Sequence, residues 1–132
     1  GLLLNDTRNY FQALKYFEQA IEKNAQLPQA YLSAAETYRE LYINTASEKY
    51  FKKASSCYQK ACSYYELDEA VWLDWASILH ESGKLNKDPA KLRLAVEKCA
   101  RAHSVAPQDG RIIAQWVESL SMLGLLKQKI KF

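Results

Sequence analysis

Cys99 and His103 stand four positions apart, which would place a thiol and an imidazole on one face of a helix. Such ligands can bind zinc. Cys62 precedes His103 by 41 residues, which is the period of an internal repeat described below, so the two residues hold equivalent positions. A structural zinc site normally has four ligands, however, and cysteine is a common core residue. We therefore interpret these three side chains as core residues and predict no metal site.

The other residues with reactive side chains are dispersed. The sequence contains no Gly-rich phosphate loop, no HExxH and no CxxC, and its acidic residues are spread along the chain. No pattern brings together a nucleophile, a base and an orienting acid. We predict no enzymatic activity and no cofactor in this segment. The three cysteines cannot all pair within one chain, so we expect reduced thiols and a cytoplasmic location.

His80 and the charge distribution bear on possible partners. We expect His80, next to Glu81, to be exposed in the last turn of a helix, where a cation suits the helix dipole, with a place in a binding groove as the alternative. The net charge is only +3 and the lysines form no single run, so we do not expect nucleic acid as a partner. No apolar run approaches the length of a membrane-spanning helix, so we expect no membrane partner.

An internal repeat with a 41-residue period organises the whole chain. One helical face consists of Tyr10, Ala13, Leu14, Phe17, Ala20 and Ile21. It recurs one period later at Phe51, Ala54, Ser55, Tyr58, Ala61 and Cys62, and again at Leu92, Ala95, Val96, Cys99, Ala102 and His103. A second face repeats with the same step, at Tyr31, Ala34, Ala35 and Tyr38, then Trp72, Trp75, Ala76 and Leu79, then Ile113, Trp116, Val117 and Leu120. Two faces that keep one spacing predict alternating helices of two kinds, called A and B.

The two faces and the turn residues give the helix spans. We predict helices over 7–24, 28–43, 46–66, 69–82, 88–105 and 109–124, of types B, A, B, A, B and A. Thr45 and Glu48 fit a capping box, and Asp88 before Pro89 fits an N-cap. Gly83 and Gly124 suit the left-handed position just after an A helix.

The motifs within these helices resemble those of tetratricopeptide repeats. YFQALKYFEQAI (10–21) is similar to the aromatic-x-x-Ala-Leu-x-x-Tyr-x-x-Ala-Ile pattern of that family's B helices. WLDWASIL (72–79) is similar to the pattern of its A helices and is followed by a glycine. The resemblance covers essentially the whole chain and implies an all-α solenoid of six to seven helices, wound as a right-handed superhelix.

The period departs from the usual one of that family, which is about 34 residues. The seven extra residues lie between the A face and the B face, so we expect longer helices at the A–B turn. Two other repeat families are alternatives. HEAT repeats have a similar length, and half-a-TPR repeats have a pattern similar to Trp72-x-x-Trp75-Ala76. We expect one array, with a half repeat over 1–25, repeats over 26–66 and 67–107, and a half repeat over 108–132. Its register suggests a piece of a longer array.

The resemblance also implies where a partner binds, because A helices line the concave groove of such arrays. The nominated residues are Gln29, Leu32, Ser33, Glu36 and Arg39, then Leu73, Asp74, Ser77 and His80, and then Arg111, Ala114, Gln115 and Glu118. Some members of that family bind the C-terminal carboxylate of chaperones with lysine, arginine and asparagine side chains. The corresponding positions here are Leu32, Glu36, Asp74 and Ser77, so we expect no binding of an Hsp70 or Hsp90 C-terminus.

The groove instead mixes apolar and acidic side chains, which suits a helix or extended peptide with some basic character. We expect a protein-binding scaffold or adaptor. The alternatives are a half-a-TPR-like scaffold of an RNA-processing complex, a regulatory array of a larger enzyme, and a secretion chaperone. Solvation of the inner face, without any partner, is the competing interpretation of the groove residues.

Overall fold

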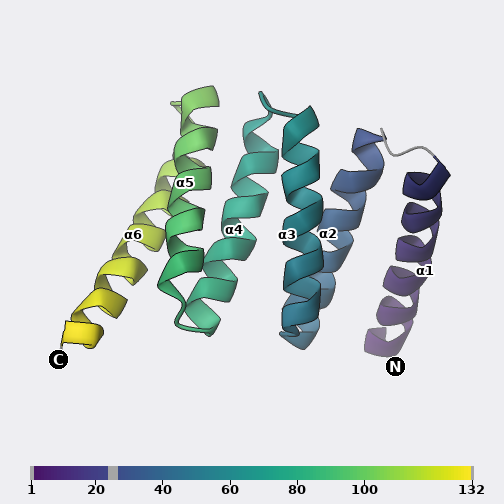
Figure 1. Cartoon of the computed structure of the whole chain (residues 1–132), viewed down its shortest axis with the longest axis horizontal. Helices are drawn as coiled ribbons and strands as arrows, with labels where there is room; N and C mark the ends of the chain where they lie inside the picture. The colour runs from purple at the N-terminus through teal and green to yellow at the C-terminus, as the bar shows by residue number, and fades with distance from the viewer. Residues whose placement is uncertain (1, 24–26, 132) are drawn as a thin grey trace. The chain divides into compact units, whose positions relative to one another are not determined.

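The computed structural model describes residues 2–23 and 27–131, and the side chains of residues 8–23 and 27–128. The described residues form six helices, namely α1 (Leu2–Lys23), α2 (Pro28–Thr45), α3 (Glu48–Tyr64), α4 (Glu69–Leu85), α5 (Pro89–Val105) and α6 (Gly110–Lys131) (Figure 1). The described part of the chain contains no strand. The predicted all-α helical-repeat class is confirmed.

The helix ends reproduce the 41-residue period. The A-type helices α2, α4 and α6 begin at residues 28, 69 and 110, and the B-type helices α3 and α5 begin at 48 and 89. The helices α1, α3 and α5 end at 23, 64 and 105. The extra residues of the repeat do extend the helices, because α4 ends at Leu85 rather than at residue 82. The first and last helices are longer than predicted, since α1 begins at Leu2 rather than at residue 7 and α6 ends at Lys131 rather than at residue 124.

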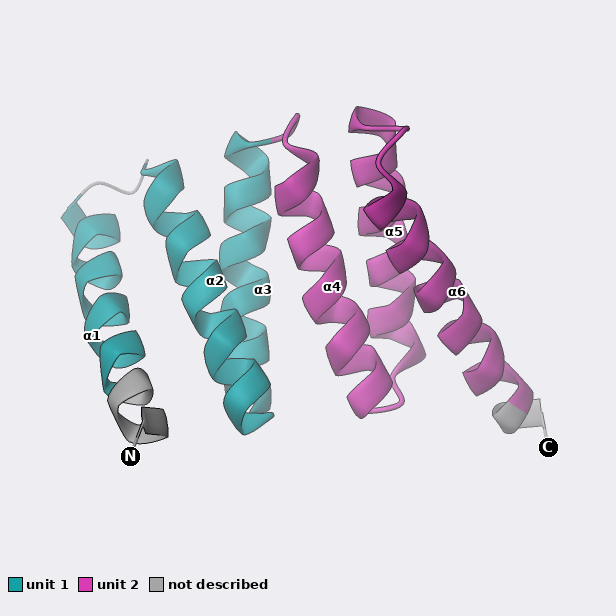
Figure 2. Cartoon of the chain, turned by 180° about the vertical axis from the view of Figure 1, so that it is seen from behind, with its two compact units in different colours: residues 1–65 teal, residues 66–132 magenta. Residues whose placement is uncertain are grey.

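Two compact units divide the chain between positions 65 and 66 (Figure 2). In the first unit, α2 packs against both α1 and α3. In the second unit, α4 and α5 pack together, and α6 contacts both of them. A helix with one apolar stripe must bury it against a neighbour, which explains why each helix within a unit packs on the next one in sequence.

The alanine columns let the B helices approach their A helices closely. Ala54 and Ala61 in α3, and Ala95 and Ala102 in α5, have no exposed surface. Larger residues fill the space between these columns, as Tyr58 does in α3, where its side chain is fully buried. The repeat therefore reflects core packing, with small residues at the closest contacts and large ones beside them.

The turn between α2 and α3 does not contain the predicted capping box. The helix α2 continues through Thr45, whose hydroxyl donates to the Leu41 carbonyl oxygen over 2.7 Å. The same Thr45 oxygen accepts from the Ser47 backbone N–H at 3.2 Å, and Ser47 is the residue that precedes α3. Thr45 therefore belongs to the end of α2, and the prediction that it caps α3 was wrong.

The predicted left-handed glycines were also misplaced. Gly83 and Gly124 lie inside α4 and α6, and no described glycine has a positive φ. The left-handed residues are Ala46 at φ 56° and Lys87 at φ 51°, which are again one period apart. Because α2 and α4 are longer than predicted, each runs past the position where a glycine turn was expected, and the chain turns at Ala46 and Lys87 instead.

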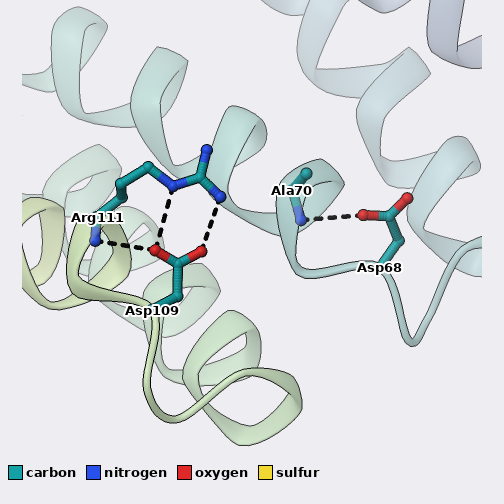
Figure 3. Close-up of polar contacts among 4 residues, drawn as sticks. All are labelled: Asp68, Ala70, Asp109 and Arg111. Atoms are coloured by element: carbon teal, nitrogen blue, oxygen red, sulfur yellow. Dashed lines mark hydrogen bonds and ion pairs between the residues drawn. The ribbon is translucent and has the colours of Figure 1, made fainter.

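Aspartates cap three of the helices. Asp88 Oδ1 accepts from the Ala90 N–H at 3.0 Å at the start of α5, which confirms the predicted cap. Asp68 accepts from the Ala70 N–H over the same distance, and Asp109 accepts from the Arg111 N–H, also at 3.0 Å (Figure 3). The carboxylate of Asp109 additionally binds the Arg111 side chain, with Nη2 2.7 Å from Oδ2.

Asp109→Asn is expected to destabilise the chain at pH 7 and to lose that effect in acid. The Arg111 side-chain hydrogen bond lowers the pKa of Asp109, so its charge stabilises the fold above the unfolded-state pKa of about 4. That stability is lost as the pH falls through the folded-state pKa. Asparagine retains an N-cap oxygen but not the charge. Urea unfolding of wild type and variant at pH 7 and pH 3 measures the change.

Asp68→Asn serves as the matched control for this prediction. Asp68 makes the same backbone cap with the Ala70 N–H, and no salt bridge to its carboxylate is seen among the described residues. Its replacement should give a smaller and less pH-dependent change in the free energy of unfolding. A difference between wild type and Asp109→Asn that persisted undiminished at pH 3 would contradict the ion-pair explanation.

Candidate partner-binding surface

The predicted groove columns of α4 and α6 meet in the second unit. The Ser77 hydroxyl donates to Gln115 Oε1 over 3.4 Å, which joins the middle of α4 to the N-terminal part of α6. Gln115 Nε2 in turn donates to the Ser119 hydroxyl, also over 3.4 Å. Four nominated residues therefore lie along one α4–α6 seam, namely Ser77, His80, Gln115 and Glu118. We call this surface the α4–α6 face.

His80 is buried at this seam, so its predicted exposure was wrong. Only 4% of its surface is accessible, and its Nδ1 lies 2.9 Å from the Ser119 hydroxyl oxygen. Its Nε2 lies 4.0 Å from a carboxylate oxygen of Glu118. Because α4 continues to Leu85, His80 is not in its last turn, and α6 covers it. The imidazole thus connects the two helices beneath the face instead of projecting from it.

Ser119→Ala is expected to lower the free energy of unfolding by about 1–3 kcal/mol, because it leaves the buried His80 Nδ1 without its partner. Urea unfolding measures the loss. Ser121→Ala, at an exposed position on the same helix, is the control and should change stability by less than about 0.5 kcal/mol. Equal effects of the two variants would show that the His80 contact contributes nothing.

The rest of the α4–α6 face combines apolar and charged side chains. Leu73 and Asp74 are half-buried on α4, while Ala114 and Glu118 are exposed on α6. Arg111 lies at the N-terminal end of α6 with its side chain largely exposed. Its hydrogen bond to Asp109 is the main cause that raises the Arg111 pKa, and the carboxylates of Glu69 and Asp74 raise it further.

The five nominated residues of α2 belong to the first unit. Gln29 and Glu36 are exposed, and Leu32, Ser33 and Arg39 are half-buried. They lie on the helix that packs between α1 and α3. Only the α4 and α6 members of the predicted groove are therefore shown to share a surface.

A repeated pocket escaped the sequence prediction. One pocket of about 400 Å³ is lined by Tyr31, Lys60 and Ser63, and another of about 410 Å³ is lined by their equivalents one period later. These equivalents are Trp72, Arg101 and Ser104. The Lys60 amine lies 5.9 Å from the Tyr31 ring centroid, and the Arg101 guanidinium carbon 5.3 Å from that of Trp72. The sequence did contain a signal for this pocket, because a basic residue and an aromatic residue both recur there with the 41-residue period.

The two cysteines of the predicted cluster lie in the core, and His103 is half-buried. Neither Cys62 nor Cys99 forms a disulfide, and burial raises the pKa of the Cys99 thiol to about 11. A thiol with such a pKa is protonated and unreactive at neutral pH. The His103 ring packs edge-on against Trp116 at 5.5 Å. Across the described ranges, no three His, Cys, Asp or Glu side chains are grouped to hold a metal ion.

No protein-family model matches this chain, and no curated protein sequence matches it. The tetratricopeptide relationship therefore stays a prediction from the motifs. Within the searched part of the chain, none of the helices has the length and apolar character needed to cross a bilayer.

Proposed function

We propose that this chain is a protein-interaction scaffold that binds a peptide or helix on the α4–α6 face. The observation that carries this proposal is the hydrogen-bonded seam in which Ser77, Gln115, Ser119 and His80 connect the two helices. The seam fixes the spacing of α4 and α6, so the side chains beside it keep their positions before a partner arrives. A preorganised surface spends less of its binding energy on ordering.

The chemistry of the face favours a partner with basic and small apolar side chains. Leu73 and Ala114 offer apolar contact, and Glu118, four residues after Ala114 on α6, has a side chain that is 69% exposed. A lysine or arginine of the partner can pair with Glu118, whereas a C-terminal carboxylate would be repelled. We accordingly propose that an acidic EEVD-type peptide does not bind, and micromolar binding of that peptide would refute this part of the proposal.

A charge-reversal pair tests the proposed surface. Peptides selected by display against the folded chain would be measured by fluorescence anisotropy on two variants, Glu118→Lys and Glu97→Lys. The two glutamates are matched, because their side chains are 69% and 66% exposed and both variants change the net charge equally. Glu118→Lys should weaken binding of a basic peptide at least tenfold, while Glu97→Lys, on α5, should leave it nearly unchanged.

The outcome that would overturn the proposal is an equal loss in both variants. Such a result would mean that the peptide responds to overall charge rather than to the α4–α6 face. An Ala114→Arg variant gives an independent steric test at an exposed position of the same face. Binding that survives both Glu118→Lys and Ala114→Arg would place the partner elsewhere.

A further inference from the structure

One face of α3 carries a stripe of lysines. Lys49, Lys53 and Lys60 are separated by four and seven residues, which places them on one side of the helix. Ser56 and Ser63 continue the same line, and all five side chains are exposed. We call these five residues the α3 lysine stripe. It belongs to the first unit and shares no residue with the α4–α6 face (Figure 2).

The repeat does not require these lysines. Their equivalents in α5, together with those of the two serines, are Ala90, Leu94, Glu97, Arg101 and Ser104. The stripe of α3 therefore carries three positive charges, whereas one acidic and one basic side chain cancel at the same positions of α5. Columns that pack in the core keep their small residues from α3 to α5, so core packing does not explain the lysines.

Each lysine amine of the stripe lies beside a tyrosine ring. The distances from Nζ to the ring centroid are 5.7 Å for Lys49 and Tyr50, 5.5 Å for Lys53 and Tyr38, and 5.9 Å for Lys60 with both Tyr31 and Tyr64. A cation is attracted to the face of an aromatic ring, so these contacts restrict where the amines point. The stripe thus presents its positive charges in a partly ordered arrangement.

Two pockets lie along the stripe. The smaller pocket, of about 170 Å³, is lined by Lys49 and Lys53 and also by Lys15 of α1. The larger one is the pocket of about 400 Å³ beside Tyr31, which is lined by the other three residues of the stripe. A partner can therefore place side chains into hollows that the lysines themselves border.

The stripe has little negative charge of its own. Glu18 is the one acidic residue among those that line the two pockets, and its Oε1 already accepts a hydrogen bond from the Tyr38 hydroxyl over 3.1 Å. Among the described residues, no salt bridge is seen to any lysine of the stripe. The amines are therefore available to carboxylates from outside the chain.

We propose that the α3 lysine stripe binds an acidic segment of a partner protein, whose aspartate and glutamate carboxylates pair with the three amines. Lys49 and Lys60 are eleven residues apart, which is about 16 Å along a helix. An extended segment needs about six residues to span that length. An EEVD-type tail spans only about 10 Å and cannot reach all three lysines, so its expected lack of micromolar binding is unchanged.

The structure favours an acidic protein segment over a single-stranded nucleic acid. Proteins that bind such strands stack the bases on open aromatic faces. Here Tyr38 is buried, its ring stacks on that of Tyr50, and the ring of Tyr31 stacks on that of Tyr64. Another helix of an array is also a poor fit, because the described helices pack through alanine and apolar columns and not through lysines.

A fluorescein-labelled octaglutamate peptide serves as the probe, titrated with the whole chain and followed by fluorescence anisotropy. At about 20 mM NaCl we expect a Kd on the order of 100 µM, because a few exposed ion pairs bind weakly. Raising the salt to about 300 mM should weaken binding at least tenfold, since screening acts on exposed charges. An octaglutamine peptide with the same label should not bind.

Three charge reversals locate the site. Lys53→Glu, in the stripe, should weaken binding at least tenfold. Lys52→Glu is the matched control, because Lys52 is exposed on the same helix but lines neither pocket, and it should weaken binding less than threefold. Lys84→Glu, at an exposed position of α4, should leave binding nearly unchanged. Circular dichroism must show unchanged helix content, and Lys53→Gln replaces Lys53→Glu if the latter loses helix.

Three results would overturn the proposal. The first is no binding of octaglutamate up to 1 mM protein at about 20 mM NaCl. The second is an equal loss in Lys53→Glu and Lys84→Glu, which would mean that the peptide responds only to overall charge. The third is tighter binding of a labelled octauridine than of octaglutamate, with the loss again in Lys53→Glu, which would assign the stripe to nucleic acid.

Discussion

Trp75→Ala is expected to lower the free energy of unfolding by about 3–5 kcal/mol, because it removes a buried double ring from the core of the second unit. The Trp75 side chain stacks on Trp72 with 6.0 Å between ring centroids. The Lys98 amine lies 4.3 Å from the centroid of the Trp75 ring, so the variant also loses a cation–π contact. The melting temperature should fall by roughly 10–15 °C, measured by circular dichroism.

Trp116→Ala is the matched control, at the same column of α6. Trp116 is only half-buried and packs edge-on against His103. Its replacement should therefore cost clearly less than that of Trp75. Equal losses from the two variants would mean that burial in α4 does not explain the contribution of Trp75.

Gly83→Ala and Gly124→Ala are expected to change stability in opposite directions. Both glycines lie inside helices, where alanine is better by about 1 kcal/mol through helix propensity alone. At Gly83, the new Cβ would lie 2.9 Å from Leu92 Cγ and 3.2 Å from the Asp88 carbonyl oxygen. Leu92 is fully buried and Asp88 is held by its N–H, which donates to the Gly83 oxygen over 2.8 Å. Neither can move away freely.

Overpacking of this kind typically costs about 1–3 kcal/mol, so Gly83→Ala should be destabilising despite its gain in propensity. Gly124→Ala should stabilise by about 0.5–1 kcal/mol, because its Cβ meets nothing within 4 Å. Urea unfolding of the two variants beside wild type gives both signs. A stabilising Gly83→Ala would show that α4 and α5 can separate without cost, which contradicts the close packing at Leu92.

The helices were predictable because packing repeats in the sequence. Ala54 and Ala95, with Ala61 and Ala102, mark the closest contacts, and only small residues fit there. The turns were not predictable in the same way. The chain turns at Ala46 and Lys87, although alanine and lysine do not favour the left-handed conformation. The length of the preceding helix fixes the position of each turn.

The candidate surface was predicted only in part. Register alone placed Ser77 and Gln115 on one side of their helices, and they do meet in the structure. Nothing in the sequence indicated that His80 is covered, because its burial depends on α6 and on Ser119, which is distant in the sequence. Contacts of this kind depend on how two helices cross, and helical periodicity carries no information about that.

The order in which the helices pack also bears on how the chain folds. Within each unit, every helix pairs with the helix next to it in sequence, so only short loops need to close before apolar surface is buried. Topologies rich in such local contacts fold within microseconds to milliseconds. A transient opening that detaches α1 from α2 can leave α2 and α3 paired, since these two helices have an interface of their own. A single helix can thus open while the neighbouring helix pair stays closed, so opening does not require the whole chain to unfold.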